Sequence, residues 1–389
     1  MDYDFDRPVD RTGTGSVKFD GLKEYFGSSD LIPMWVADMD FQVPGSVIKA
    51  IKERADHGIF GYTLITPSFY NAIINWMQVR HDWEVSANWV LFSPGIVPAL
   101  TMSVIALTEI GDKILLQSPV YPPFYHSIQG SERLLVNNQL TQVNGAYSID
   151  YEDLEQKLSQ GVKMMLFCNP HNPVGRVWTR HEIEEVVSLC RKYKVILVSD
   201  EIHSDLIYPD HRHIPAAVNK YGTDNLIICM APSKTFNLAG LASAFLIIPD
   251  VGLRRKMKRL IENFHLHYGN LFGLVALQAA YEGGGAWLDA LIGYLQANRD
   301  TLVEFFRKEI PEINPIIPQG TYLVWLDCKK TGMNDRELKK FFVKGAGIAT
   351  NPGPSFGPGG EGFHRINIGC RRAVLLESLI KIKHAWQQR

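Results

Sequence analysis

Paired cysteines, long apolar runs and an excess of one charge are all missing from this chain of 389 residues. The five cysteines are scattered singly, without a Cys-x-x-Cys motif, which excludes a disulfide framework and favours a reducing, cytoplasmic setting. No apolar run reaches the length that a membrane helix needs, and the acidic residues 1–7 are unlike a secretory signal. We therefore expect no membrane partner.

Charge is balanced, with 40 basic and 41 acidic residues and a formal net charge of -1. The short basic cluster at residues 254–259 is typical of a solvated helix face, so we expect no nucleic-acid partner. His211 and His213 stand close together, but they lack His-x-x-x-His spacing and a matching acidic partner. No metal site is expected there.

Apolar residues form 46% of the chain, which at this length is enough for two domains with separate cores. Between residues 46 and 290, short apolar runs alternate with longer amphipathic stretches, which predicts a large α/β domain with a mostly parallel sheet. Thr179 and Glu182 form a candidate capping box at the start of a helix. Strands are expected at residues 89–93, 113–117, 163–168, 195–199, 226–230 and 243–248, and helices at 150–158 and 179–193.

The pattern changes towards the C-terminus. A long helix is expected at residues 286–309, strands at 321–326 and 365–369, and a helix at 335–344. Residues 351–360 are so dense in Pro and Gly that we expect a loop. Residues 1–45 and 291–389 are predicted to form a second, smaller α+β domain.

Ligands of open α/β sheets bind at the carboxyl ends of the strands, so residues at these ends are candidate site residues. Gly95 follows the strand at 89–93 and opens a helix whose free backbone N–H groups suit a phosphate, although Pro-Gly turns before helices are common. Tyr121 follows the strand at 113–117, and the two prolines after it restrict its backbone. This tyrosine suits stacking on a planar ring or packing on the core.

Three later strands also end in candidate residues. Asn172 lies in a rigid loop with two Asn-Pro pairs, from which its amide can donate a hydrogen bond. Asp200 ends an apolar run, where it suits a cation such as a protonated pyridine nitrogen, or else caps a helix. Lys234 follows the strand at 226–230, where poor solvation favours a neutral amine that forms a Schiff base with an aldehyde; alone, it would suit a solvated turn. Together these are the groups that pyridoxal 5′-phosphate needs.

Three motifs carry a family resemblance: Asn-Pro-His-Asn-Pro-Val-Gly at residues 169–175, Asp-Glu-Ile-His at 200–203 and Ser-Lys-Thr-Phe-Asn-Leu-Ala-Gly at 233–240. They resemble the motifs of fold-type I pyridoxal-phosphate enzymes in the aminotransferase class I/II superfamily. Residues 31–41, 60–62, 93–98 and 118–125 more narrowly resemble the MalY/PatB branch of carbon–sulfur β-lyases. The resemblance implies a PLP-dependent transferase-like fold with a seven-stranded sheet in the large domain.

The resemblance also implies a role for each residue around the cofactor ring. Lys234 is expected to be the catalytic residue and to bind the cofactor aldehyde as a Schiff base. Asp200 is expected to pair with the ring nitrogen, Asn172 to bond the ring hydroxyl and Tyr121 to stack on the ring. His203 is expected beside the ring, where many transaminases have Tyr, so the second contact to the ring hydroxyl stays open.

Further residues are assigned by the resemblance to the phosphate and the substrate. Gly95, Ile96 and Ser233 are expected to hold the phosphate, and Tyr62 to reach the phosphate of the neighbouring subunit, which implies a homodimer with shared active sites. For the substrate, the resemblance implies that Arg365 would clamp the α-carboxylate and that Trp35 would line the substrate side. Gly240-Leu-Ala242 stands where transaminases have Gly-x-Arg, so an arginine contact to the phosphate is missing.

These departures favour a lyase over an ordinary transaminase. We expect a cystathionine β-lyase or cysteine-S-conjugate β-lyase that cleaves an L-cysteine thioether to a thiol, pyruvate and ammonia by α,β-elimination. With L-cystathionine as the substrate, the thiol is homocysteine. The alternatives are an aminotransferase that uses the same lysine and carboxylate and, from another class, a regulatory protein that modulates a transcription activator.

Overall fold

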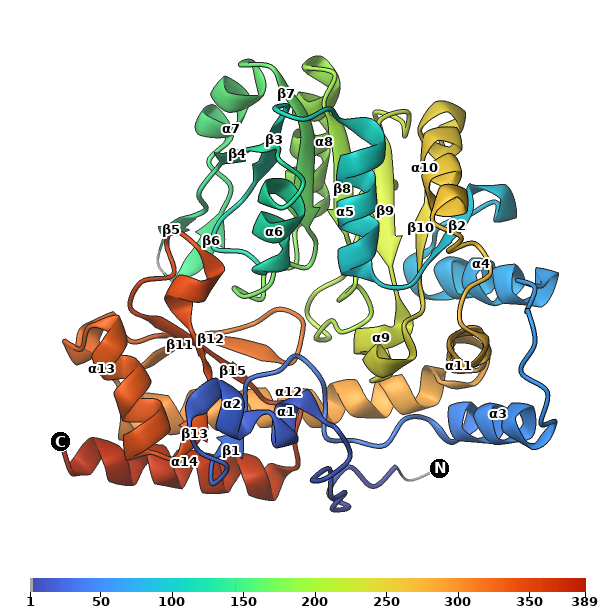
Figure 1. The fold of residues 1–389 in the computed structure, drawn as a ribbon. Coiled ribbons are helices and arrows are strands. Elements are labelled where there is room, and N and C mark those ends of the chain that lie inside the picture. The colour runs from blue at the N-terminus through green and yellow to red at the C-terminus, as the bar shows by residue number, and fades with distance from the viewer. Residues whose placement is uncertain (1–2, 144) are drawn as a thin grey trace.

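The computed structural model describes residues 3–143 and 145–389, and its central element is a sheet of seven strands (Figure 1). All neighbouring strands are parallel except where β10 lies antiparallel between β2 and β9. The predicted mostly parallel, seven-stranded sheet is therefore confirmed. In spatial order the strands are β2 (Val90–Ser93), β10 (Ala244–Ile247), β9 (Leu226–Met230), β8 (Ile196–Asp200), β7 (Val162–Cys168), β3 (Lys113–Leu116) and β4 (Leu134–Asn137).

Helices cover both faces of this sheet, because successive side chains of a strand point to opposite faces. On β7, Met164 and Leu166 belong to a core cluster with the helices α5, α6 and α10, whereas Met165 and Phe167 belong to the cluster with α4, α7, α8 and α11. Apolar residues on both faces explain the continuous apolar runs of the central strands. The helices are α3 (Gly45–Asp56), α4 (Pro67–His81), α5 (Ile96–Leu107), α6 (Pro123–Gln129), α7 (Tyr151–Leu158), α8 (Arg180–Lys192), α10 (Val251–Asn263) and α11 (Leu271–Gly283).

A smaller antiparallel sheet of four strands, in the order β11-β12-β15-β14, forms the second part of the molecule. The N-terminal segment joins it, since β1 (Ile32–Pro33) pairs in parallel with β13 (Ile348–Ala349). The other elements here are α1 (Val17–Asp20), α2 (Leu22–Phe26), α12 (Gly285–Glu309), β11 (Asn314–Ile316), β12 (Leu323–Asp327), α13 (Asp335–Lys340), β14 (Asn351–Pro352), β15 (Phe363–Asn367) and α14 (Arg372–Gln387). A hairpin of β5 (Thr141–Val143) and β6 (Ala146–Ser148) lies on the left in Figure 1, between the large sheet and the smaller sheet.

The helix α12 runs along the lower side of the molecule in Figure 1 and continues through residue 290 without a break. The predicted boundary between the large domain, 46–290, and the small domain, 1–45 with 291–389, therefore falls inside this helix. We propose this division as the domain organisation of the chain. No helix of the described residues is long and apolar enough to cross a membrane.

Most predicted elements are confirmed with shifts of one or two residues. The strand at 226–230 has the predicted bounds, and the long helix begins one residue earlier than predicted, at Gly285. Thr179 is the N-cap of α8, and its side chain and that of Glu182 form both bonds of the predicted capping box. The start of this helix could therefore be predicted from the local sequence.

Three predictions were wrong or incomplete. The expected loop at 351–360 contains the strand β14 and a 3-10 turn at Gly353–Phe356, and Pro352 is tolerated because β14 is the edge strand of its sheet. The expected helix at 335–344 is α-helical only to Lys340 and then forms a π-helical turn at Phe341–Gly345. The edge strand β4 was missed, because it is short and partly exposed and so shows no clear apolar run.

Replacing Thr179 by Ala leaves the backbone N–H of Glu182 without its side-chain acceptor. We expect the free energy of unfolding to fall by about 1 kcal/mol, the usual cost of losing a Thr N-cap. Urea unfolding followed by circular dichroism measures the change. His181→Ala is the matched control on the same exposed turn and should stay within about 0.5 kcal/mol of the wild type. Equal stability of the two variants would contradict the capping role.

Candidate active site

One cavity lies where β7, β8 and β9 end and α5 begins. These elements place polar side chains from distant parts of the sequence around one space, as the rule for open α/β sheets predicts. Eight of the predicted site residues line the cavity together: Gly95, Ile96, Tyr121, Asn172, Asp200, His203, Ser233 and Lys234.

Lys234 lies in α9 (Pro232–Thr235), a single helical turn directly after β9. Its Nζ donates a hydrogen bond of 2.7 Å to the backbone carbonyl of Ala37. Burial lowers the pKa of Lys234 to about 8, although the nearby carboxylate of Asp38 acts in the opposite direction. A substantial fraction of this amine is therefore neutral and nucleophilic near physiological pH.

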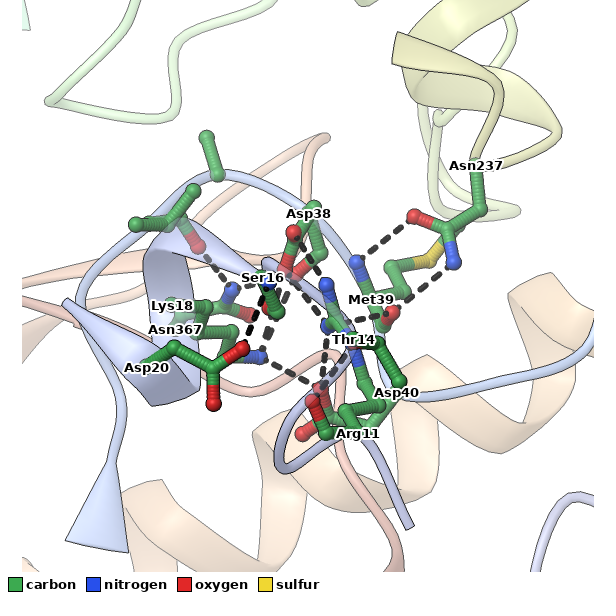
Figure 2. Close-up of polar contacts among 12 residues, drawn as sticks. Arg11, Thr14, Ser16, Lys18, Asp20, Asp38, Met39, Asp40, Asn237 and Asn367 are labelled. Atoms are coloured by element: carbon green, nitrogen blue, oxygen red, sulfur yellow. Dashed lines mark hydrogen bonds and ion pairs between the residues drawn. The ribbon is translucent and has the colours of Figure 1, made fainter. Parts of the chain in front are cut away.

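The carbonyl of Ala37 belongs to residues 35–41, which we call the N-terminal strap. Side chains from two distant segments hold the backbone of this strap, as Figure 2 shows. Asn237 accepts a hydrogen bond of 2.9 Å from the N–H of Met39 and donates one of 2.8 Å to its carbonyl. Asn367 donates to the carbonyl of Asp38 at 2.7 Å. The position of the Ala37 carbonyl is thus set by both parts of the molecule.

Ion pairs fix the strap from its other side (Figure 2). Arg11 contacts Asp38 at 2.7 Å and Asp40 at 2.8 Å. Lys18, whose side chain is 1% exposed, contacts Asp40 at 2.9 Å. Two cations and two carboxylates therefore neutralise one another beside the cavity, and the segment that precedes the strap is tied to it.

Asp200 is buried at the carboxyl end of β8, and its Oδ1 accepts a hydrogen bond of 3.1 Å from the N–H of Ile202. Burial raises the pKa of Asp200 to about 7, and the positive charge of Lys234 offsets this only in part. In the described part of the chain no Lys or Arg forms an ion pair with this carboxylate. The site is therefore suited to a cationic group of a ligand that keeps Asp200 ionised.

Another part of the cavity lining is suited to an anion. The helix α5 begins at Ile96 without a side-chain cap, so its first backbone N–H groups are free to bind a ligand. Ser233 and Ser243 contribute hydroxyl groups to the lining. The hydroxyl of Ser243 is buried and has no hydrogen-bond partner among the described residues. Two hydroxyls and a helix N-terminus form a site for a phosphate.

Arg365 lies on β15 and, although it is not part of the cavity lining, it contacts Asn172, which lines the cavity. Its guanidinium donates to Asn172 Oδ1 at 3.0 Å, to the carbonyl of Trp35 at 3.0 Å and to Asn351 Oδ1 at 2.8 Å. Burial lowers the pKa of Arg365 to about 10, and its Nε has no partner among the described residues. A buried guanidinium held only by neutral acceptors is suited to a carboxylate ligand.

Asn172 connects this guanidinium to the cavity. Because its Oδ1 accepts from Arg365, its amide N–H₂ group remains available as a donor toward the cavity that it lines. Its backbone carbonyl accepts the N–H of Tyr121 at 3.1 Å, which fixes the loop of that tyrosine.

His203 lines the same cavity and is buried. Burial lowers the pKa of His203 to about 3, so the ring is neutral in the physiological range. Its Nδ1 has no hydrogen-bond partner among the described residues, and its ring lies edge-on to Tyr322 at 6.2 Å between centroids. The predicted contact of His203 with a cofactor stays a prediction.

Three predicted site residues, Trp35, Tyr62 and Arg365, are not part of the cavity lining. The indole of Trp35 packs with Leu22 and Tyr25 and donates to the carbonyl of Lys18, so Trp35 approaches the site through its backbone carbonyl. The side chain of Tyr62 is 98% exposed and lies beside Tyr268 at 5.8 Å between ring centroids. Within a single chain, Tyr62 is therefore outside the site.

Sequence reasoning missed two residues of the site. The hydroxyl of Tyr322 donates at 2.8 Å to the carbonyl of Ala37, which also accepts from Lys234. Ser243 comes beside the segment before α5 because the next residue, Ala244, pairs with Ser93. No local motif marks either residue, since both positions depend on long-range pairing.

Comparisons with known proteins identify the family of this chain. The chain belongs to the aminotransferase class I and II family, whose model matches residues 29–382. It is 45% identical over 383 residues to cystathionine beta-lyase PatB of Bacillus subtilis, covering 98% of this chain and 99% of that protein.

Solved structures of similar fold contain pyridoxal phosphate. The fold resembles that of cystalysin from Treponema denticola, which contains a pyridoxal 5′-phosphate cofactor, with a TM-score of 0.97 and 33% identity over 100% of both chains. It also resembles the PLP-bound C-S lyase from Staphylococcus hominis, with a TM-score of 0.93 and 37% identity over 99% of this chain and 98% of that chain. The predicted family and the fold-type I class are confirmed.

The lowered pKa of Lys234 predicts how its reactivity depends on pH in the cofactor-free protein. Because burial disfavours the charged amine, carbamylation of Lys234 by cyanate should be half-maximal near pH 8. Exposed lysines should follow the ordinary lysine pKa of about 10.4 and serve as the internal control. Peptide mass spectrometry across a pH series measures both. A midpoint for Lys234 equal to that of the exposed lysines would contradict the burial effect.

Proposed function

We propose that the protein is a pyridoxal-phosphate-dependent carbon–sulfur β-lyase. It cleaves L-cystathionine or related L-cysteine S-conjugates to a thiol, pyruvate and ammonia. The observation that carries the proposal is that one cavity combines a buried amine, Lys234, with a buried carboxylate, Asp200, that has no cationic partner in the described structure. The names of the relatives, a cystathionine beta-lyase and C-S lyases, support the reaction.

The residues present fit each part of this cofactor. The N-terminus of α5 at Gly95 and Ile96, with the hydroxyls of Ser233 and Ser243, would hold the phosphate. Asp200 would hold the ring nitrogen in its protonated form, and this charge pair would keep the carboxylate ionised.

The face and the hydroxyl of the ring have their own partners. Tyr121 would stack on the ring, and the amide N–H₂ group of Asn172 would bond the ring hydroxyl. His203, neutral in the physiological range, would lie beside the ring. Lys234 would bind the aldehyde.

The substrate is bound through its carboxylate. The guanidinium of Arg365 has no acidic partner in the described part of the chain, and its planar donor pair matches a carboxylate. Trp35 supports this guanidinium through its backbone carbonyl. An amino acid with a thioether at Cβ is therefore held with its Cα near Lys234.

When bound, the cofactor supplies an electron sink for the electron pair that proton removal leaves at Cα. Lys234 is the base that takes this proton, because burial favours its neutral form once it is free. The loss of the proton at Cα allows the thiolate to leave Cβ and take up a proton. Water then hydrolyses the remaining enamine to pyruvate and ammonia.

The side chains of Asp200 and Arg365, which would bind the cofactor and the substrate, have opposite charges. Burial raises the pKa of Asp200 to about 7, so a cation beside it favours the ionised carboxylate, whereas Arg365 is positively charged and is suited to an anion. The site therefore selects a ligand pair with a cationic ring and an anionic carboxylate.

We propose that the active unit is a homodimer in which Tyr62 reaches the phosphate in the partner's site. The support is an exposed apolar patch around Tyr62, since a monomer rarely leaves so many large apolar side chains in water. The exposed residues of this patch are Ile59, Phe60, Tyr62, Leu64 and Tyr268. We also propose a cytoplasmic location, in keeping with five free cysteines.

The function is tested by incubating the purified, cofactor-loaded protein with L-cystathionine and no oxo acid. We expect stoichiometric pyruvate and homocysteine, measured with lactate dehydrogenase and a thiol reagent. Asp200→Asn should lower kcat by at least about 100-fold, the usual scale for losing one preorganised electrostatic contact. Product formation that depends strictly on 2-oxoglutarate would instead identify an aminotransferase.

The shared site is tested by mixing two inactive variants, Tyr62→Ala and Lys234→Ala. Random dimers of a 1:1 mixture should regain about a quarter of the wild-type activity, because half are hybrids with one complete site each. A Tyr62→Ala/Lys234→Ala double variant mixed with wild type is the control and should give no complementation. Failure of the first mixture to regain activity would exclude a shared site.

A further inference from the structure

A second carboxylate, Asp205, lies five residues after Asp200 but outside the cavity lining. It is 6% exposed and accepts three side-chain hydrogen bonds. The donors are Trp76 Nε1 at 3.1 Å, His81 Nε2 at 2.9 Å and Thr235 Oγ1 at 2.9 Å. Although burial alone would raise it, the hydrogen bond from His81 lowers the pKa of Asp205 below its ordinary value. The lowered pKa favours the ionised carboxylate, and both of its oxygens accept hydrogen bonds.

One of these donors, Thr235, is the residue next to Lys234. Both lie in α9, a helical turn of four residues whose N-cap, Ala231, offers no side-chain cap. A single turn has no stability of its own in water, because its nucleation is unfavourable. The position of Lys234 therefore depends on contacts that the turn makes with the rest of the protein.

Those contacts converge on Trp76 and Asp205. Phe236, which follows the turn, packs edge-on against Trp76 at 5.6 Å between ring centroids. Trp76 in turn donates to Asp205, and Asp205 accepts from Thr235. On the far side, Asn237 ties the chain to the N-terminal strap (Figure 2). Lys234 is thus held from both sides, by Asp205 and by the strap.

We propose that Asp205 is a positioning residue for the lyase reaction, which holds the Lys234 amine in line with the substrate Cα through the hydroxyl of Thr235. This inference rests on the proposed function, because it assigns Lys234 its part in proton removal. Asp205 does not line the cavity, and its direct contact with α9 is the hydrogen bond from Thr235.

The side chains that donate to Asp205 lie outside the cavity lining. His81 donates to Asp205 and lies edge-on to His213, at 5.5 Å between ring centroids. His213 donates to the separate buried carboxylate of Glu201 at 2.8 Å. His81 thus donates to Asp205 from α4 and Thr235 donates from α9, so the carboxylate connects the two helices.

The first test compares two substitutions of Thr235, one that removes its hydroxyl group and one that keeps it. Thr235→Val deletes the hydroxyl and keeps the shape, whereas Thr235→Ser keeps the hydroxyl. We expect kcat for L-cystathionine to fall about 10- to 100-fold in Thr235→Val, because small misplacements of a reacting group carry costs of this size. KM should change less than about 3-fold, since Arg365 is untouched. Thr235→Ser should stay within about 3-fold of wild type in both.

The matched control is Thr331→Val, which deletes another buried threonine hydroxyl, one that donates to the carbonyl of Cys328 at 2.6 Å. It should leave kcat and KM unchanged. Asp205→Asn should act in the same direction as Thr235→Val. A Thr235→Val variant with wild-type kcat, or one whose loss Thr235→Ser shares, would overturn the proposal.

The second test asks whether the effect passes through Lys234. In Lys234→Ala, methylamine can replace the missing amine, and this free base is not attached to α9. Adding Thr235→Val to Lys234→Ala should then cause no further loss of the rescued rate, as a double-mutant cycle requires for one shared function. An equal loss in both backgrounds would overturn the proposal.

The third readout does not need turnover. Pyridoxal phosphate is added to cofactor-free protein, and the absorbance of the Schiff base with Lys234 is followed in time. The rate should fall at least about 10-fold in Thr235→Val and stay unchanged in Thr331→Val. If the wild type forms the Schiff base but releases no pyruvate, the proposed function fails while this comparison still tests Asp205. Equal rates in wild type and Thr235→Val would overturn the positioning role.

Discussion

Charge buried without a full counter-charge is the constraint on which the rest of this structure depends. Lys234, Asp200 and Arg365 all lie in the protein interior, and none has an opposite charge as its direct partner in the described residues. Each would be costly to bury on its own. The fold meets part of this cost with fixed dipoles, namely the carbonyls of Ala37 and Trp35 and the N–H of Ile202. A ligand with a cationic ring and a carboxylate would supply the opposite charges, so part of its binding energy would come from these buried groups.

The N-terminal strap shows how such a site is kept in place. Its backbone carbonyls point toward Lys234 and Arg365, and a carbonyl has no rotamers with which to adapt. Its position must come from elsewhere, which explains why the ion pairs of Arg11 and Lys18 and the amides of Asn237 and Asn367 surround this short segment. The strap is therefore rigid because of its neighbours, not because of its own sequence.

Much of the site could be predicted from the sequence, because its parts follow strands. Buried parallel strands appear as apolar runs, and one rule places the residues after them at a common edge. Asp200, Asn172 and Lys234 were found in this way and do line one cavity. Family motifs then assigned their roles, which the strand pattern alone left open.

The rest depends on contacts between distant segments. Ser243 reaches the cavity through the antiparallel register of β10 with β2, and Tyr322 meets Ala37 across 285 residues. Asp205 gave no local signal, since its three donors come from α4 and α9. Short edge strands such as β14 were also hidden, because a Pro-rich segment reads as a loop until its pairing partner is known. Register and pairing are properties of the folded molecule, and periodicity does not encode them.

The pairing of β1 with β13 and the bonds from Asn367 to the strap also have a consequence for biosynthesis. Domains begin to fold while the chain is still being made, from the N-terminus onward. Here the strap is made among the first residues, yet two of the groups that hold it, Arg365 and Asn367, are among the last. The contacts with Arg11, Lys18 and Asn237 can therefore form early, but the full set of contacts can form only when almost the whole chain has been made. A chain that ends before Arg365 would contain Asn172, Asp200 and Lys234 and still lack two of the groups that hold the strap.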